Sequence, residues 1–176
     1  MHRRKGAIEQ KQQDPITLTK DAEKPDLNKI IMDLHTITNC NRYKTRIDCS
    51  QLNISRIHES LMVELDKSRI TQVVYNLLDN AFKFTNNGDA IHIILDVEFI
   101  NDQKYVVISI RDSGKGIDKE ILPKLFTKFT TMSEKGIGLG LYIAKSIIEA
   151  HSGRIWARNN VNGTGATFSF TLPCGA

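Results

Sequence analysis

RITQVVYNLLDNAFKFT, residues 69–85, is the stretch that predicts the fold. At the 100° per residue of an α-helix, its apolar side chains fall on one face and its polar side chains on a neighbouring stripe. The apolar face consists of Ile70, Val74, Leu77 and Ala81, and the polar stripe of Arg69, Gln72, Asn76, Asn80 and Lys83. We expect a long helix that begins after a capping Asp66 and ends near Phe84, before an Asn-Asn-Gly stop.

The polar stripe is unusual for a surface that only faces solvent. Asparagine is unfavourable inside a helix because its side chain competes for backbone hydrogen bonds, yet Asn76 and Asn80 stand one turn apart and Lys83 follows them. Amide oxygens suit a hard cation such as Mg²⁺ that also binds substrate phosphates, and a lysine suits a phosphate. The stripe is therefore either an ordinary solvent face or a site for Mg²⁺ and phosphate.

Segments on the C-terminal side of this helix predict a sheet. Residues 90–99 and 104–112 predict a hairpin, and residues 154–159 and 166–172 predict a last strand pair around Asn-Gly-Thr-Gly. Residues 141–153 predict a second amphipathic helix, with Gly153 as its C-terminal cap. The order of these elements indicates an α+β layer pair, a mostly antiparallel sheet with helices on one face.

The N-terminal part of the chain has a different character. Residues 1–25 are polar and contain two prolines, which predicts a flexible tail or linker remnant before a single domain at 26–176. Within that domain, residues 27–37 have helical periodicity, and residues 43–49 and 60–66 predict two short strands.

Composition excludes several classes of protein. The 176 residues are 40% hydrophobic and 25% charged, which excludes wholesale disorder, collagen and coiled coil. We expect no membrane insertion and no secretory signal, since no apolar run approaches roughly 18 residues and none follows the basic N-terminus. The net charge of +4 allows a polyanionic ligand. The sequence has no stripe of arginines and lysines with interleaved aromatics, which argues against nucleic acid binding. The chain has three cysteines, an odd number, and they lack the short spacing of a metal site. They therefore predict free thiols in a reducing cytoplasm.

Two glycine-containing segments could approach a ligand closely. Asp112 ends a predicted strand and is followed by Gly114 and Gly116, so the segment is either a tight turn or a carboxylate that accepts a hydrogen bond from a ligand amine. Gly136, Gly138 and Gly140 alternate just before the second helix. This arrangement predicts a backbone cradle for phosphates, with a flexible loop as the alternative. A P-loop and a dinucleotide fold are excluded, since the required motifs are missing.

The segment between the two glycine regions contains Phe126 and Phe129 three residues apart. It predicts either a short helix anchored by two aromatics or a lid that closes over a nucleotide. In the second case, Lys128 and Lys135 would reach the phosphates.

Taken together, five ordered motifs resemble those of sensor histidine kinases. They are NLLDNAFKFT, DSGKGI, LFTKF, GIGLGL and GTGATFSF, and the resemblance covers roughly residues 26–173. In those kinases the motifs belong to the ATP-binding catalytic domain, so the resemblance implies a domain of the superfamily that also holds gyrase, a chaperone and mismatch-repair ATPases. The resemblance implies the Bergerat-type ATP-binding fold, a two-layer α/β sandwich with a mixed, mostly antiparallel sheet covered on one face by helices.

The same resemblance implies ATP and Mg²⁺ as cofactors and assigns roles to the motif residues. Asn80 would ligate Mg²⁺, Asn76 would lie near the phosphates and Lys83 would contact them. Asp112 would bind the adenine amino group, and Gly114 and Gly116 would flank the adenine. The remaining nucleotide-binding positions would be Ile117, Phe126, Lys128, Phe129, Lys135, Gly136, Ile137, Gly138, Leu139, Gly140, Leu141 and, in the pocket floor, Thr167.

Position 76 indicates the type of reaction. Hydrolytic members of the superfamily place a glutamate there to activate water, whereas an asparagine amide is no general base. We therefore expect transfer of the γ-phosphate to a histidine, with catalysis by positioning and charge neutralisation.

The expected partners lie outside this chain. None of its histidines, among them His35, His58, His92 and His151, fits the phosphoacceptor motif of the family. The resemblance thus implies a separate histidine-bearing dimerisation domain, a response-regulator receiver domain, a cytoplasmic location and a monomer in isolation. The alternatives are a non-catalytic ATP-dependent regulatory module, an anti-sigma-type serine protein kinase, a hydrolytic ATPase and a nucleic-acid-binding domain.

Overall fold

The computed structural model describes residues 52–55, 63–86, 90–130, 137–161 and 163–174. Its elements are β1 (Leu52–Ser55), α2 (Lys67–Phe84), β2 (Ile91–Ile100), β3 (Gln103–Arg111), the 3₁₀ turn η2 (Leu122–Lys124), α3 (Gly140–Ala150), β4 (Ile155–Asn159) and β5 (Ala166–Pro173). The predicted tail, the helix at 27–37 and the strand at 43–49 lie outside the described residues. No helix in the described part of the chain has the length and apolarity to cross a membrane.

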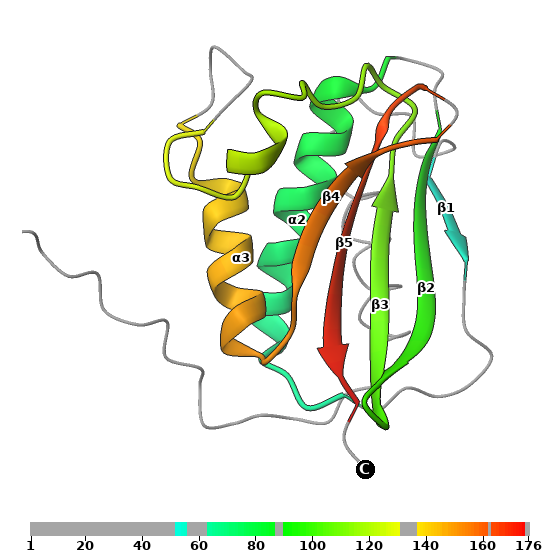
Figure 1. Ribbon diagram of the computed structural model, residues 1–176, viewed down its shortest axis with the longest axis vertical. Helices are drawn as coiled ribbons and strands as arrows, with labels where there is room; N and C mark the ends of the chain where they lie inside the picture. The colour runs from blue at the N-terminus through cyan, green and yellow to red at the C-terminus, as the bar shows by residue number, and fades with distance from the viewer. Residues whose placement is uncertain (1–51, 56–62, 87–89, 131–136, 162, 175–176) are drawn as a thin grey trace, which may run out of the picture.

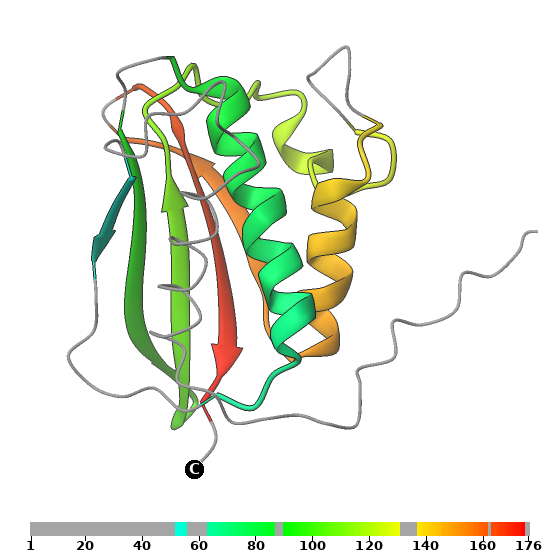
Figure 2. The ribbon, with the colours of Figure 1, turned by 180° about the vertical axis from the view of Figure 1, so that it is seen from behind.

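The strands form one sheet in the order β1-β2-β3-β5-β4. β1 pairs with β2 in parallel, and the other neighbours are antiparallel. Figures 1 and 2 show α2 and α3 side by side against one face of this sheet. The mixed, mostly antiparallel sheet and the two-layer α/β arrangement expected from the sequence are therefore confirmed.

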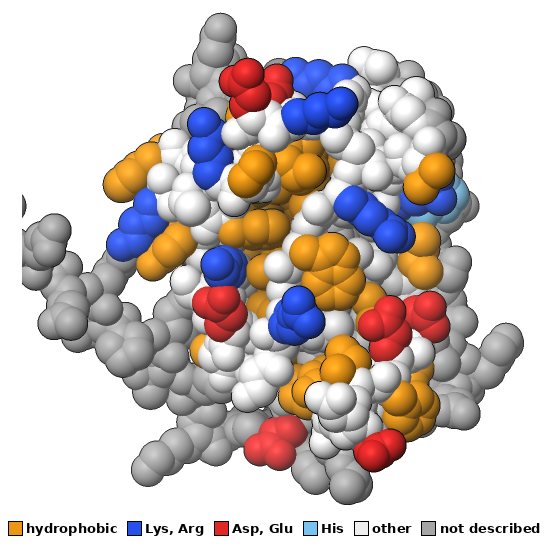
Figure 3. All heavy atoms as spheres, in the orientation of Figure 1, with side chains coloured by type: hydrophobic (Ala, Val, Ile, Leu, Met, Phe, Trp, Pro, Cys, Tyr) orange, Lys and Arg blue, Asp and Glu red, His pale blue; other side chains and the backbone are white. Residues whose placement is uncertain are grey.

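The core lies between the helices and the sheet. It takes the apolar face of α2, the inward-facing alternate residues of β2, β3 and β5, and the inner face of α3. Burying each such large aliphatic side chain contributes roughly 1.5–3 kcal/mol relative to exposure. The opposite face of the sheet carries exposed hydrophobic, basic and acidic side chains, as Figure 3 shows.

Asp66 caps α2 as predicted. Its Oδ1 accepts hydrogen bonds from the backbone N–H groups of Ser68 (3.0 Å) and Arg69 (3.1 Å). The strand predicted at 60–66 is wrong within its described part, because residues 63–66 contribute only a single bridge at Leu65. The apolar residues Val63 and Leu65 alternate with polar ones because both are buried in the core just before the helix. The sequence did not predict the strand β1.

The end of α3 differs from the prediction. The helix stops at Ala150, and Ser152 rather than Gly153 adopts the left-handed conformation (φ +57°). Gly153 is needed for another reason: a Cβ there would lie 2.0 Å from the carbonyl oxygen of Thr171. The glycine therefore permits close contact with β5 and is not the left-handed cap.

Candidate nucleotide-binding site

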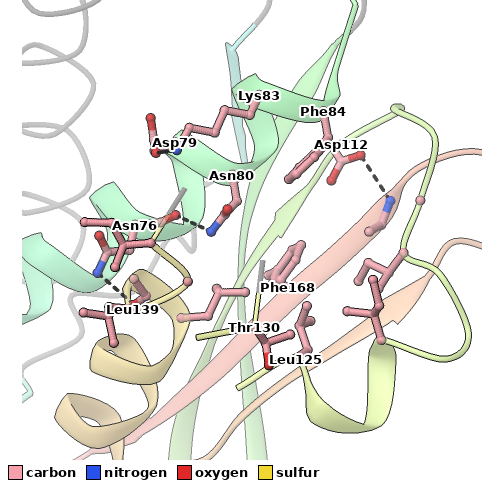
Figure 4. Close-up of a pocket in the computed structure, with 18 residues that line it drawn as sticks. Asn76, Asp79, Asn80, Lys83, Phe84, Asp112, Leu125, Thr130, Leu139 and Phe168 are labelled. Carbon is pink, nitrogen blue, oxygen red and sulfur yellow. Dashed lines mark hydrogen bonds and ion pairs between the residues drawn. The ribbon is translucent and has the colours of Figure 1, made fainter. Parts of the chain in front are cut away.

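A cavity of about 390 Å³ opens between α2, the start of α3, the loop after β3 and the first residues of β5. Figure 4 shows side chains from all four regions converging on it. Its lining consists of Asn76, Asp79, Asn80, Lys83, Phe84, Asp112, Gly116, Ile117, Ile121, Leu125, Thr130, Ile137, Gly138, Leu139, Gly140, Leu141, Ala166 and Phe168. An apolar cavity of this size with a few convergent polar groups is typical of a small-molecule site.

The polar stripe of α2 forms one wall. Asn76 Nδ2 donates to the carbonyl oxygen of Gly140 (3.1 Å), and Asn80 Nδ2 donates to the carbonyl oxygen of Asn76 (2.8 Å), as the dashed lines in Figure 4 indicate. Both bonds use amide nitrogens. Each side chain therefore keeps its Oδ1 as an acceptor or cation ligand, and the first bond also ties α2 to the start of α3.

Lys83 is the cation of this wall. Its Nζ forms an ion pair with Asp79 one turn earlier, and the two side chains are 44% and 40% exposed. Exposed ion pairs of this kind contribute only about 0–1 kcal/mol. A phosphate with a higher charge could therefore draw the ammonium group away from Asp79 at small cost.

Asp112 is the anionic group at the far end of the cavity and is only 4% exposed. Its Oδ1 accepts hydrogen bonds from the N–H groups of Gly114 (2.9 Å) and Ala166 (3.2 Å). Burial raises the pKa of this carboxyl, and the two backbone bonds oppose the rise. The held orientation leaves Oδ2 as the oxygen able to accept from a ligand.

Gly114 and Gly116 have different roles in the loop after β3. A Cβ on Gly114 would lie 2.1 Å from the carbonyl oxygen of Phe84, so this glycine lets the loop pack against the end of α2. Gly116 has φ +77° and itself lines the cavity. Both positions therefore require glycine, one for contact and one for conformation.

The N-terminus of α3 faces the cavity without a side-chain cap. Its capping position is Leu139, which offers no side-chain acceptor to the first backbone N–H groups. These groups and the helix dipole make the start of α3 favourable for an anion. Gly138, with φ +71°, brings this turn so close to Phe129 and Thr130 that a Cβ would lie 2.6 Å from the Phe129 carbonyl carbon.

Comparison with known families identifies the domain. Residues 65–176 match the model of the histidine kinase-, DNA gyrase B- and HSP90-like ATPase family. The chain belongs to this family. Among histidine kinases, the Clostridium acetobutylicum sensor protein KdpD is 43% identical over 129 residues, covering 70% of this chain and 14% of that protein. Sensor histidine kinase WalK of Bacillus subtilis is 38% identical over 119 residues, covering 64% of this chain and 19% of that protein.

Among solved structures, a histidine kinase catalytic domain has the same fold as this chain. The catalytic domain of histidine kinase ThkA superposes with a TM-score of 0.70 at 32% identity, covering 85% of this chain and 93% of that domain. This chain therefore corresponds in extent to a histidine kinase catalytic domain and spans less than a fifth of the two sensor proteins above. The family expected from the five motifs is confirmed.

Most of the family's motif residues meet at the cavity. The predicted residues that line it are Asn76, Asn80, Lys83, Asp112, Gly116, Ile117, Ile137, Gly138, Leu139, Gly140 and Leu141. Lys135 and Gly136 lie outside the described residues. What each lining residue does to a nucleotide stays a prediction.

Thr167 does not lie in the pocket floor. Ala166 and Phe168 line the cavity, and strand alternation turns Thr167 to the opposite face of the sheet. There its hydroxyl donates to Asn160 Oδ1 (2.6 Å).

The phenylalanine segment divides into two environments. Phe126 packs, partly buried, against the core, while Phe129 is 71% exposed and has a left-handed backbone (φ +62°). Lys128 lies over the ring of Tyr142, 5.0 Å from its centre. None of these three lines the cavity. Within the described residues 121–130, the predicted short helix is reduced to the 3₁₀ turn η2, which ends before both phenylalanines.

Sequence reasoning missed several lining residues: Asp79, Phe84, Ile121, Leu125, Thr130, Ala166 and Phe168. Two of them had a signal, since Asp79 and Phe84 follow Asn76 and Asn80 at helical spacing on the same side of α2. Ala166 and Phe168 become recognisable only once β5 is known to pair with β3 beside Asp112.

Proposed function

We propose that this chain binds MgATP in the cavity and donates the γ-phosphate to a histidine on a separate phosphoacceptor domain. One observation carries the proposal. Asp112 lies at one end of a single cavity, and Asn80, Lys83 and the uncapped start of α3 lie at the other. A base recognised by the carboxylate and a triphosphate held by cationic and N–H groups would span that distance. The kinase names of the relatives support the same reading.

The donor set fits a magnesium ion. Asn80 keeps its Oδ1 after its nitrogen has bonded to the helix, and Asn76 does the same. Such neutral oxygens suit Mg²⁺, which usually takes few protein ligands and several from phosphate and water. When bound, the ion would neutralise charge on the phosphates, and Lys83 would act on them as a point charge.

The transfer would proceed by displacement at the γ-phosphorus. An imidazole nitrogen of the acceptor histidine forms the new bond to phosphorus, the bond to the bridging oxygen breaks, and ADP leaves. Asn76 stands where a base would be needed to activate water and cannot take a proton. The chain therefore favours an acceptor that is itself a nucleophile, and it contributes by positioning the nucleotide.

The proposal extends to the setting of the reaction. The dimerisation and receiver domains would be supplied by other parts of the signalling system, on the cytoplasmic side of the membrane. The isolated chain would be a monomer.

The test is an equilibrium titration with ATP, with and without Mg²⁺, followed by transfer from labelled ATP to a supplied histidine domain. We expect one-to-one binding strengthened by Mg²⁺ and a labelled histidine. Asn80→Ala should abolish the Mg²⁺ enhancement and the transfer. Gln72→Ala is the matched control, since it lies on the same stripe of α2 outside the cavity and should retain both.

Other outcomes would identify the alternatives. Binding without transfer would favour a regulatory module, and phosphate release into solution would favour a hydrolytic ATPase. Transfer to a serine would favour the anti-sigma type of kinase. Absence of ATP binding at millimolar concentration would refute the proposal.

A further inference from the structure

Two consecutive asparagines at the end of β4 hold the loop that contains Asp112, although neither lines the cavity. Asn159 makes a pair of bonds to one residue of that loop. Its Oδ1 accepts from the N–H of Ile117 (2.7 Å), and its Nδ2 donates to the carbonyl oxygen of Ile117 (2.8 Å). The Asn159 amide therefore satisfies both backbone groups of Ile117, as a neighbouring strand would do. Ile117 itself lines the cavity.

Asn160 holds the other end of the loop. Its Nδ2 donates to the carbonyl oxygens of Asp112 (2.8 Å) and Thr164 (2.8 Å), and its Oδ1 accepts from the Thr167 hydroxyl (2.6 Å). Both hydrogens of the amide and its oxygen are thus engaged. Thr167 supports Asp112 from behind the sheet, through Asn160.

Close contacts with Asn159 and with Asp112 explain two of the glycines. A Cβ on Gly116 would lie 2.9 Å from Asn159 Oδ1, and a Cβ on Gly165 would lie 2.1 Å from the carbonyl oxygen of Asp112. Both glycines also have left-handed backbones, with φ of +77° and +76°. The geometry thus leaves room for the asparagine side chains to reach the main chain of the loop.

We propose that Asn159 and Asn160 are positioning residues for recognition of the nucleotide base. By fixing residues 112 and 117, they set where the Asp112 carboxylate and the apolar side chain of Ile117 meet the ring. This inference rests on the proposed function, because it concerns the base of the nucleotide bound there. It assigns the two residues a role in selecting adenine, while the phosphates are held from α2 and α3.

The experiment compares ATP with inosine triphosphate, which carries an oxo group in place of the 6-amino group. Dissociation constants are measured for the full chain, Asn159→Ala and Asn160→Asp. Asn160→Asp keeps the acceptor for Thr167 but removes both N–H donations. We expect the preference for ATP to fall about tenfold in either variant, the equivalent of one or two hydrogen bonds. Gln103→Ala, which loses a bond to Cys174 at the other end of the sheet, should keep the full preference.

A second measurement needs no nucleotide. Amide hydrogen exchange at Ile117 should become faster in Asn159→Ala than in the unchanged chain, because its acceptor is gone. Failure of the unchanged chain to bind ATP would refute the proposed function. Unchanged exchange at Ile117 in Asn159→Ala would separately refute the positioning role of Asn159. Equal weakening of ATP and inosine triphosphate would also overturn the inference, since it would show a general loosening of the pocket.

Discussion

At the scale of single residues, the charge of Asp112 lowers the stability of the folded protein while serving the proposed binding of ATP. A buried carboxylate loses hydration, and the hydrogen bonds from Gly114 and Ala166 recover only part of that loss, so burial raises the pKa of Asp112 above its ordinary value. A raised pKa means that the folded protein holds this proton more tightly than the unfolded chain does. Asp112 therefore destabilises the folded state progressively as the pH rises from the ordinary pKa of an aspartate through the raised pKa of the folded state.

Asp112→Asn tests this opposition. The amide Oδ1 can still accept from Gly114 and Ala166 without carrying a charge, so we expect a higher melting temperature at pH 7 and weaker ATP binding. The measurements are a thermal unfolding curve without nucleotide and an ATP titration. A lower melting temperature, or unchanged affinity, would contradict the assigned role.

The pH dependence of ATP binding follows from the same carboxylate. Protonation removes an acceptor for the adenine amino group, so affinity should fall as pH falls toward the raised pKa of Asp112 from above. Titrations of the unchanged chain across that range measure the effect. The Asp112→Asn variant is the control, and a decline of the same size in it would assign the effect to another group.

Single residues were predictable where their chemistry conflicts with their position. Asn76 and Asn80 stand out because asparagine is unfavourable inside a helix, and Asp112 because it ends an apolar strand before glycines. Thr167 was misplaced because a residue name does not reveal which face of a strand it occupies. Asn159 and Asn160 gave no signal, since polar residues near a turn are common.

At the scale of elements, His151 joins the end of α3 to the beginning of α2. It is 7% exposed; its Nε2 accepts from the N–H of Asp66 (3.0 Å), and its Nδ1 donates to the carbonyl oxygen of Ile147 (2.8 Å). The ring therefore holds together the two helices that carry the site, at the end opposite to the cavity.

His151→Ala should lower the free energy of unfolding by about 2–4 kcal/mol, because it leaves a buried N–H without its acceptor and opens a void. Denaturant unfolding monitored by circular dichroism measures the change. Lys145→Ala removes only an exposed ion pair on the same helix and should cost less than about 0.5 kcal/mol. Equal values for the two variants would contradict the joining role.

The β2–β3 hairpin offers a stabilising change. Its two-residue turn, Asn101-Asp102, has φ of +50° and +63°, a conformation that glycine adopts more readily than other residues. Asp102→Gly should therefore raise the free energy of unfolding by about 0.5–1 kcal/mol without changing ATP affinity. The denaturation midpoint measures it, with Asp102→Ala as the control that should not stabilise. A midpoint that falls in Asp102→Gly would refute the expectation.

The existence of long elements was easier to predict than their ends. The periodicity of α2 and the alternation of β2 and β3 follow from a buried side facing an exposed one. The end of α3 depends on how near β5 passes to Gly153, which is a long-range contact. β1 is short and pairs with the distant β2, so local pattern did not reveal it.

At the scale of the whole molecule, the cavity is assembled from four regions separated along the chain. A nucleotide that bridges α2, the loop at 112–117 and the start of α3 should protect all three from hydrogen exchange. We expect MgATP to slow exchange in these segments and to leave the hairpin at 97–106 unchanged. Exchange measured by mass spectrometry tests this. Protection confined to the opposite face of the sheet would place the nucleotide elsewhere.

The sequence by itself determined the family, the layer arrangement and most residues that converge on the cavity. It could do so because burial imposes periodicity on helices and strands, and because glycines and internal asparagines are costly where they have no role. The tertiary structure alone decided which neighbours complete the site: Phe168 facing inward, Thr167 facing outward, and Asn159 and Asn160 bonded to a loop more than 40 residues away. Those relations depend on strand register and on main-chain atoms, which every residue has and which no local pattern therefore reveals.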